Sequence, residues 1–291
     1  MRGIEISNID IEMSKEKINV DSLQLLISTK GKNNFTFLSK MFKNCNISDY
    51  SILIVDQSEK PKSRSSISKY KNIEYFNIPA NGLSNSRNFA ISHSSAKICL
   101  LCDDDVIYEK NFAELIINSF ESNDLDVITY YAKTEDGNLF KNYPQIKSHN
   151  IKSISFVNTF LIAFRREKII MNDIKFDSLF GLGSTFETGD EYIFLRNVIN
   201  NNNLNIACCP EIILTHPSES SGQFAGRDEN IFARAAIFYK FYGTLAYFKL
   251  IHHIYLLKKK NMITISQMVY KFKIGLKGIF RYKQLYLKEV K

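Results

Sequence analysis

Three adjacent aspartates, Asp103, Asp104 and Asp105, follow the apolar run at residues 98–102, at the point where a buried strand is expected to end. Neighbouring carboxylates repel one another by about 1 kcal/mol or more per close pair at surface-like dielectric, so a fold that holds three together usually supplies a cation. Oxygen ligands of this kind suit a hard divalent ion. The alternative is a solvated acidic turn ahead of a helix that begins near Glu109.

Short apolar runs that alternate with helix-like segments position these aspartates. We expect strands at residues 23–28, 52–55, 73–76, 98–102 and 127–131, and helices at residues 35–42, 84–93 (capped by Ser84) and 111–120. The βαβ order predicts an α/β fold whose mostly parallel sheet is flanked by helices. In such sheets ligands bind beyond the carboxyl ends of the strands, so Thr29, Asp56 and the aspartates are expected to meet in one crevice.

The second half of the chain has a different character. We expect a strand at residues 156–164, a helix at 189–200 capped by Thr188, short strands at 206–209 and 212–215, and helices from residue 230 onward. The polar, glycine-containing stretch at residues 216–227 predicts a mobile loop.

The composition is that of a soluble, folded protein. The chain has 291 residues, 45% hydrophobic and 23% charged, which suits one catalytic domain with a tail. Its five cysteines lack the spacing of a zinc ribbon and fit a reducing cytoplasm. Residues 1–20 lack the apolar core of a signal peptide, and no run approaches the roughly 18 apolar residues of a membrane span. We therefore expect a protein that is neither secreted nor membrane-spanning.

The net charge of +8 is concentrated in one part of the chain. Residues 238–291 hold twelve Lys and Arg against one acid, giving 12 − 1 = +11, and the remainder carries 26 − 29 = −3. A nucleic-acid enzyme would carry basic groups around its cleft, so we expect no nucleic-acid partner. Lysines interleaved with aromatic residues are typical of helices on an anionic membrane surface; the alternative is a helical cap whose lysines face water.

Five segments, taken in order, carry a family resemblance: residues 26–29, 54–58, 81–88, 101–105, and 189–191 followed by His216. They resemble the inverting GT-A glycosyltransferases of family 2, which build bacterial surface polysaccharides. The resemblance covers residues 23–242 and implies a Rossmann-like GT-A sheet with a helical C-terminal appendage. The expected parts are an N-terminal extension at 1–20, a catalytic domain at 21–237 with nucleotide-binding (21–131) and acceptor (132–237) halves, and a basic tail at 238–291.

The resemblance also implies the partners of the reaction. The donor would be a nucleotide sugar, with UDP as the expected nucleotide, and the acceptor a hydroxyl of a glycan or lipid-linked glycan. Mn²⁺ or Mg²⁺ would assist departure of the diphosphate. The enzyme would work in the cytoplasm, attached through its tail to the inner face of the cell membrane.

Several residues of the first half would bind the nucleotide if the resemblance holds. Asp56 would accept a hydrogen bond from a uracil-type imide, and Ser28, Thr29 and Lys30 would frame the base and ribose. Arg87 offers a forked cation for the nucleotide or its phosphates. Its alternative role is that of a surface arginine paired with a carboxylate at a helix end.

The aspartate triplet would divide its work between nucleotide and metal. The family pattern implies that Asp104 binds ribose, that Asp103 assists, and that Asp105 coordinates the divalent ion. The register stays open, because Asp103 and Asp105 also satisfy a D-x-D pattern. His216 resembles the additional metal or phosphate ligand of such enzymes, although a lone histidine is more often structural.

Inversion requires a base that takes a proton from the incoming hydroxyl. The family's usual Gly-Glu-Asp is replaced here by Gly189-Asp190-Glu191, and position favours Glu191 with Asp190 as the alternative. The alternative is that Asp190 and Glu191 serve only to stabilise the N-terminus of a helix. Arg227 follows a candidate lid at residues 218–226 and could reach the diphosphate; the alternative is an immobile surface loop.

Two other functions compete with this interpretation. Asp103-x-Asp105 after an apolar strand also resembles the nucleophile motif of haloacid-dehalogenase phosphotransferases, but that family places the motif on its first strand, and here at least three strands precede it. The other is a noncatalytic nucleotide-sugar-binding or scaffold protein, which requires that Asp190 and Glu191 do not face the donor.

Overall fold

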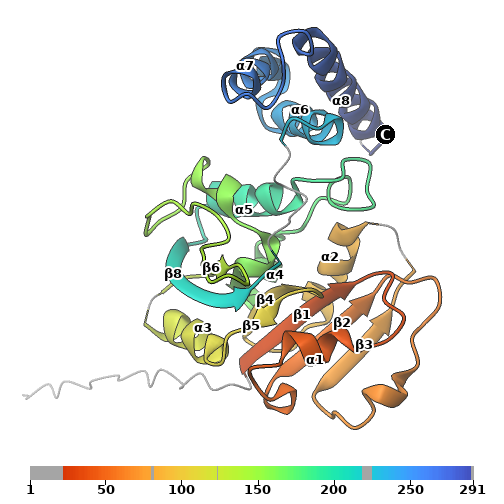
Figure 1. Cartoon of the computed structure of the whole chain (residues 1–291), viewed down its shortest axis with the longest axis vertical. Helices are drawn as coiled ribbons and strands as arrows, with labels where there is room; N and C mark the ends of the chain where they lie inside the picture. The colour runs from red at the N-terminus through yellow and green to blue at the C-terminus, as the bar shows by residue number, and fades with distance from the viewer. Residues whose placement is uncertain (1–21, 80–81, 123, 218–224, 290–291) are drawn as a thin grey trace, which may run out of the picture.

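A computed structural model describes residues 22–79, 82–122, 124–217 and 225–289 (Figure 1). Its centre is a sheet of eight strands in the order β3-β2-β1-β4-β7-β6-β8-β5. The strands are β1 (Leu23–Thr29), β2 (Ser51–Asp56), β3 (Ile73–Asn77), β4 (Ile98–Asp103), β5 (Ile107–Tyr108), β6 (Val127–Lys133), β7 (Ile162–Arg165) and β8 (Ile206–Thr215). The β3-β2-β1-β4 half is parallel, as is the β6-β8 pair, and the pairs that involve β7 or β5 are antiparallel.

Helices cover both faces of the sheet. They are α1 (Phe37–Met41), α2 (Leu83–His93), α3 (Phe112–Glu121), α4 (Arg166–Met171) and α5 (Asp190–Asn200). The hydrophobic cluster on one face includes residues of α1 and α3, and the cluster on the other includes residues of α2, α4 and α5. Because side chains alternate along a strand, Leu25 and Ile27 join the first cluster and Leu26 the second. This two-sided burial explains why the strands are nearly continuous apolar runs.

The register brings the carboxyl ends of three strands to one edge. Ser28 in β1 pairs with Asp103 in β4, and Thr29 pairs with Asp56 in β2. Parallel strands that end level with one another place the residues that follow them around a common crevice. The predicted convergence of these strand ends is therefore confirmed.

The predicted strands of the first half are confirmed, and the second half needs two corrections. The strand predicted at residues 156–164 is limited to β7, because two 3-10 helices at residues 153–156 and 159–161 occupy most of that stretch. The two short strands predicted around Pro210 form one strand, β8. A shift in the β6–β8 register between Thr129 and Tyr131 skips the proline, which has no N–H to donate.

Glycines, and not the predicted Ser84 and Thr188, occupy the N-cap positions of the two helices that carry site residues. Gly82 precedes α2 with φ 98°, and Gly189 precedes α5 with φ 88°, values that other residues rarely adopt. The hydroxyl of Ser84 instead donates to the Phe180 carbonyl oxygen at 2.6 Å, which ties α2 to the loop ahead of α5.

Three further helices, α6 (Asp228–Tyr242), α7 (Ala246–Lys259) and α8 (Met268–Glu289), lie beyond α5 at the top of Figure 1. Their buried residues form a separate hydrophobic cluster, and a fourth cluster joins α6 and α8 to α5 and to residues 179–186. The predicted boundary between residues 237 and 238 falls within α6. No helix in the described residues is long and apolar enough to cross a membrane.

Candidate active site

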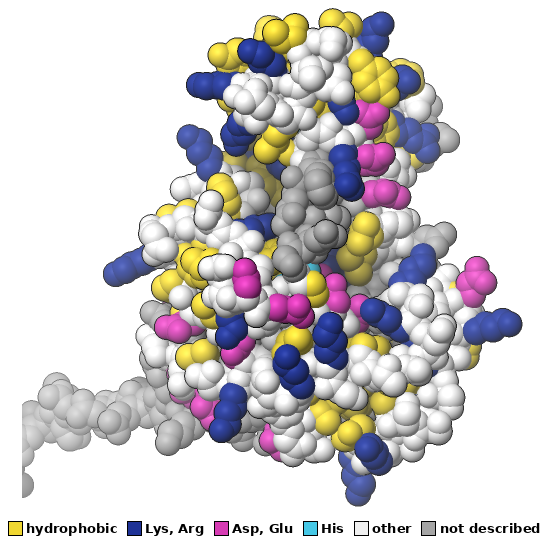
Figure 2. Space-filling view, in the orientation of Figure 1, with side chains coloured by type: hydrophobic (Ala, Val, Ile, Leu, Met, Phe, Trp, Pro, Cys, Tyr) yellow, Lys and Arg dark blue, Asp and Glu magenta, His cyan; other side chains and the backbone are white. Residues whose placement is uncertain are grey.

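A cleft of about 230 Å³ opens at the carboxyl end of β4. Its walls come from α2, the turn after β4, the segment at residues 158–160, the start of α5 and the end of β8. It brings together six of the residues predicted from the sequence: Arg87, Asp103, Asp105, Asp190, Glu191 and His216. Figure 2 shows acidic side chains gathered at mid-height on this face, with one histidine visible among them.

Arg87 is buried at the centre of the cleft's wall. Its Nη2 donates to Asp103 Oδ1 at 3.0 Å, and its Nη1 forms an ion pair with Asp190 Oδ2. One guanidinium therefore joins the end of β4 to the start of α5. The predicted alternative of an arginine paired with a helix-end carboxylate is present, but the pair is buried and not on the surface.

Asp56 has a fully satisfied carboxylate and no exposed surface. Oδ1 accepts from the backbone N–H of Ser58 at 3.0 Å and from its hydroxyl at 2.7 Å, and Oδ2 accepts from the Tyr75 hydroxyl at 2.9 Å and pairs with Lys62. Burial by itself would raise the pKa of Asp56, but the hydrogen bonds from Lys62, Ser58 and Tyr75 outweigh it and lower the pKa. A nucleobase can reach the Asp56 carboxylate only if the Lys62 side chain moves away from it.

The strand-end residues predicted to frame the ribose do lie together. Thr29 Oγ1 donates to Asp104 Oδ2 at 2.5 Å, and Lys32 Nζ lies 3.3 Å from Asp104 Oδ1. Ser28 is buried and accepts a hydrogen bond from Ser86 at 2.9 Å. Lys30 is exposed next to this group.

Asp105 and His216 face each other across the cleft. Nδ1 of His216 lies 2.7 Å from the Pro217 carbonyl oxygen, so we assign the ring proton to Nδ1. Nε2 then directs a lone pair at Asp105 Oδ1, 3.6 Å away. The Asp105 Oδ1 and His216 Nε2 atoms are both acceptors, so their approach favours a cation between them. In addition, a histidine that donates its other N–H to a backbone carbonyl is typical of metal ligands.

Asp105 and His216 would supply only part of the ligands of a metal ion. Among the described residues, no group of three or more His, Cys, Asp or Glu side chains could enclose a metal ion. The Asp105 side chain is 49% exposed toward the cleft. An ion that keeps waters and takes most of its ligands from a bound diphosphate needs only one or two protein ligands, so Asp105 and His216 fit such an ion.

The two acids at the start of α5 differ in their surroundings. Asp190 is buried and holds Arg87, whereas Glu191 is half-buried and lines the cleft next to Lys141. Burial, followed by the charge of the adjacent Asp190, raises the pKa of Glu191. Burial lowers the pKa of Lys141, and the attraction of Glu191 opposes that effect. A carboxylate with a raised pKa is a stronger base than an ordinary glutamate.

Arg227, like the predicted Ser28, Thr29, Lys30, Asp56 and Asp104, does not line the cleft. It is exposed ahead of α6, and the proposed lid at 218–226 lies largely outside the described residues, which resume at Ala225. Sequence reasoning also missed several residues near the site, namely Lys32, Lys62, Lys141 and Asn158. Asn158 Oδ1 is buried in the cleft wall without a hydrogen-bond partner in the described structure, and no sequence pattern marks it.

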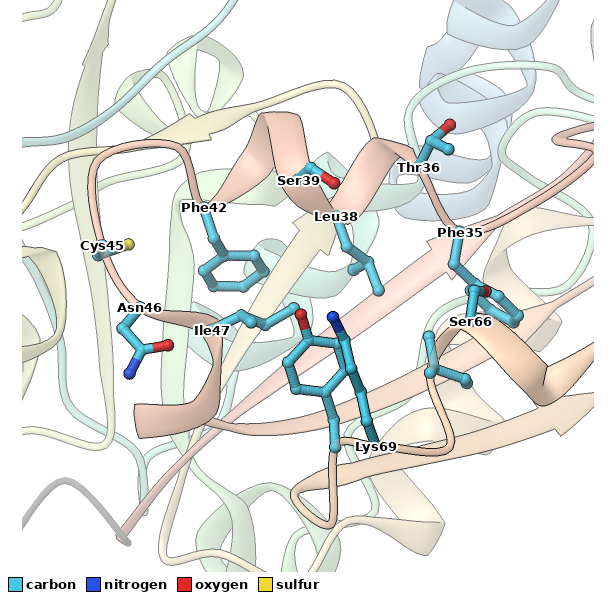
Figure 3. A pocket seen from close by; sticks show the side chains of 12 residues that line it. Phe35, Thr36, Leu38, Ser39, Phe42, Cys45, Asn46, Ile47, Ser66 and Lys69 are labelled. Atoms are coloured by element: carbon cyan, nitrogen blue, oxygen red, sulfur yellow. The ribbon is translucent and has the colours of Figure 1, made fainter.

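A second pocket, of about 300 Å³, lies under α1 (Figure 3). The side chains of Phe35, Phe42 and Ile47 point into it, with Lys69 at its margin. It shares no lining residue with the acidic cleft and contains no carboxylate or histidine. Of these two pockets, the cleft is therefore the one that holds carboxylates and a histidine.

The fold and this cleft are those of a GT-A glycosyltransferase. Among solved structures, S. aureus TarS 1–349 is similar with a TM-score of 0.58 and 11% identity, covering 92% of each chain. The mannosyltransferase PcManGT from Pyrobaculum calidifontis, in complex with GDP-Man and Mn²⁺, is similar with a TM-score of 0.54 and 10% identity, covering 94% of this chain and 81% of that one. These likenesses confirm the predicted fold.

Residues 32–185 match the sequence model of Glycosyl transferase family 2, so the chain belongs to that family. The predicted family and enzyme class are thereby confirmed, and the haloacid-dehalogenase alternative has no support. A comparison with curated proteins finds no match.

Arg87→Met would leave Asp103 and Asp190 as two adjacent carboxylates without their cation. Removing one partner of a buried ion pair costs about 3–5 kcal/mol, so we expect the free energy of unfolding to fall by that amount. Urea denaturation followed by circular dichroism measures the loss. Arg281→Met, on the exposed side of α8, is the matched control. Equal stability of the two variants would contradict the bridging role of Arg87.

Proposed function

We propose that this protein is a metal-dependent inverting glycosyltransferase. It moves a sugar from a nucleotide sugar, with UDP as the nucleotide, to a hydroxyl of a glycan or lipid-linked glycan in surface polysaccharide assembly. The observation that carries the proposal is that one cleft holds the open ligand pair Asp105 and His216 together with Glu191, a carboxylate with a raised pKa. Solved complexes of the similar TarS contain UDP and UDP-GlcNAc, which supports a UDP-sugar as donor.

The nucleotide would lie along the ends of β1 and β2. Asp104, already held by Thr29 and Lys32, presents carboxylate oxygens for ribose hydroxyls. A uracil imide would donate to Asp56 after the Lys62 side chain has moved away. The ammonium of Lys62 would then be free to face the diphosphate or a base carbonyl oxygen.

Asp105 and His216 would hold Mn²⁺ or Mg²⁺ together with oxygens of the diphosphate. Such an ion neutralises the charge that develops on the leaving diphosphate. Mn²⁺ in the complex of the similar mannosyltransferase supports this choice of ion. The assignment leaves Asp103 out of the metal shell, because Arg87 already holds its Oδ1.

Glu191 is the base in this proposal. The acceptor hydroxyl gives its proton to the Glu191 carboxylate while its oxygen forms a bond to the sugar's anomeric carbon. The bond from that carbon to the diphosphate breaks at the same time, and its electron pair leaves with the diphosphate. Attack opposite the leaving group inverts the configuration. Asp190 is the weaker candidate because its carboxylate is buried against Arg87 and acts by positioning.

The helical tail would attach the enzyme to an anionic membrane surface on its cytoplasmic side. One side of α7 packs inward through Leu250, Ile254 and Leu257, and the other exposes apolar side chains; Phe248 is 72% exposed and Ile251 55%. Lys and Arg lie among the apolar side chains in the upper part of Figure 2. Apolar side chains surrounded by cations suit the headgroup region of a bilayer.

A panel of nucleotide sugars, tested for thermal stabilisation with and without Mn²⁺, checks donor and metal together. A ligand present at 100 times its Kd stabilises the folded state by about 2.7 kcal/mol, so we expect a clear rise in melting temperature with a UDP-sugar and Mn²⁺. Asp105→Asn should lose the Mn²⁺-dependent part of the rise, whereas Asp124→Asn, remote from the cleft, should keep it. Absence of stabilisation by every nucleotide sugar would refute the proposed donor class.

Glu191→Gln should lower sugar transfer about 100-fold or more, because it removes the base, while donor binding persists. The base must be ionised, so wild-type activity should fall as pH drops through the raised pKa of Glu191. Asp190→Asn removes a neighbouring negative charge, lowers that pKa and should move the acidic limb of the pH–rate profile to lower pH. Glu167→Gln, exposed on α4, serves as control. An unchanged rate in Glu191→Gln would eliminate this base.

Membrane attachment is checked by cosedimentation with phosphatidylglycerol vesicles. Binding should weaken as salt increases, because screening reduces the attraction of the lysines. The double change Phe248→Ser and Ile251→Ser removes side chains worth about 1.5–3 kcal/mol each when fully buried, and should greatly reduce binding. Met171→Ser, 74% exposed outside the tail, should bind as wild type does. Binding that is equal in all variants, or independent of salt, would rule out this surface.

A further inference from the structure

A smaller cavity of about 110 Å³ adjoins the active-site cleft on the side of α6 and α7. The cleft and the cavity share three lining residues: Lys141, Thr188 and Glu191. Its remaining walls include Tyr192 from α5, Arg234 from α6 and His253 from α7. A molecule in this cavity would therefore reach Glu191 from the side opposite the aspartate triplet.

The cavity is lined by nitrogen-bearing side chains, and Glu191 is the one carboxylate among its lining residues. Arg234, Lys141 and His253 are each half-buried. In the part of the chain that the structure describes, no carboxylate lies within ion-pair distance of Arg234 or Lys141. The guanidinium carbon of Arg234 lies 5.7 Å from the centre of the Tyr192 ring, a contact that leaves its N–H donors unused.

Arg234 and Lys141 outnumber the one carboxylate among the lining residues, Glu191, and give the cavity a positive potential. Burial is the main cause that lowers the pKa of His253 to about 4, and the charges of Arg234, His252 and Lys260 lower it further. Burial lowers the pKa of Lys141 as well. Moving a cation from water into a buried site costs free energy unless a partner compensates for the lost hydration. An anionic ligand that accepts hydrogen bonds from Arg234 and Lys141 provides that compensation. The forked guanidinium of Arg234 matches the oxygens of a phosphate group.

We propose that the acceptor carries a phosphate group and that Arg234 and Lys141 bind it, with His253 closing the far side of the cavity. The inference rests on the proposed glycosyl transfer and names the class of its acceptor. Lys141 and Glu191 line both spaces, so the phosphate lies only a few bonds from the hydroxyl that receives the sugar. A neutral glycan would leave Arg234 without an anionic partner among the described residues.

Calorimetric titration of the full chain with glycerol 3-phosphate, and separately with glycerol, tests the site. Wild type should bind the phosphate ester and not the neutral alcohol. Losing one hydrogen bond to a charged group weakens binding by about tenfold or more, so Arg234→Gln and Lys141→Gln should each show that loss. The matched controls are Arg281→Gln and Lys147→Gln, which are exposed away from the cavity. Circular dichroism melts verify that all four variants fold.

A second arm separates the two sources of a phosphate. Vesicles of phosphatidylcholine that contain phosphatidic acid present the same group at a lipid surface. Reduced vesicle binding by Arg234→Gln relative to Lys147→Gln, which lies outside the tail, would identify a lipid phosphate. Unchanged vesicle binding together with lost glycerol 3-phosphate binding would identify a soluble or polymeric one. Both results support the site.

The proposal is overturned if wild type does not distinguish glycerol 3-phosphate from glycerol, or if Arg234→Gln and Lys141→Gln bind the ester as their controls do. Arg234 would then only pack against Tyr192. Donor binding is scored independently with Arg234→Gln, because Arg234 does not line the cleft proposed for the donor. Failure of the phosphate site with retained donor binding is thereby distinguishable from failure of the glycosyltransferase proposal.

Discussion

The Arg87 guanidinium, held between Asp103 and Asp190, is the interaction on which the site depends. Asp103 ends β4 in the nucleotide-binding part of the sheet, and Asp190 begins α5 in the second half of the chain. A single cation thus fixes the distance between the place where a diphosphate would lie and the helix that carries Glu191. Because the Asp103 and Asp190 carboxylates are largely enclosed and paired with Arg87, the other acids of the cleft are the ones available to a ligand.

The carboxylates divide into committed and available groups. Asp56 and Asp190 are buried and saturated by their own cations, whereas Asp105 and Glu191 reach the cleft. This division assigns different chemistry to adjacent residues. Asp105 can serve a metal because no Lys or Arg among the described residues forms an ion pair with it. Glu191 can take a proton because burial, and then the adjacent Asp190, raise its pKa. In the proposed mechanism, the exchange of Asp190 and Glu191 relative to the usual family pattern therefore keeps one positioning acid and one reactive acid.

β1, β2 and β4 were predictable because they are buried on both faces, which forces continuous apolar runs, and the family motifs located six of the residues that line the cleft. The features that could not be predicted from the sequence are those that depend on tertiary contacts. Arg87 and Asp190 are 103 residues apart, so no spacing rule could pair them. The saturation of Asp56 by Lys62 depends on how a polar loop folds back, and the burial of Asn158 depends on irregular 3-10 segments. Sequence patterns identify periodic helices and strands but do not show how irregular loops fold.

The helices α6, α7 and α8 help to build the site. Gly189, which starts α5, lies so close to α6 that an added Cβ would meet Ile237 Cδ1 at 2.4 Å, so the helix bearing Glu191 is packed directly on α6. The same helices supply Arg234 and His253 to the cavity beside that base. If the outer side of α7 rests on a membrane, the orientation of the acceptor cavity is fixed with it. Attachment and acceptor recognition are then two faces of one helical unit, which explains why a basic tail accompanies a cleft rich in acids.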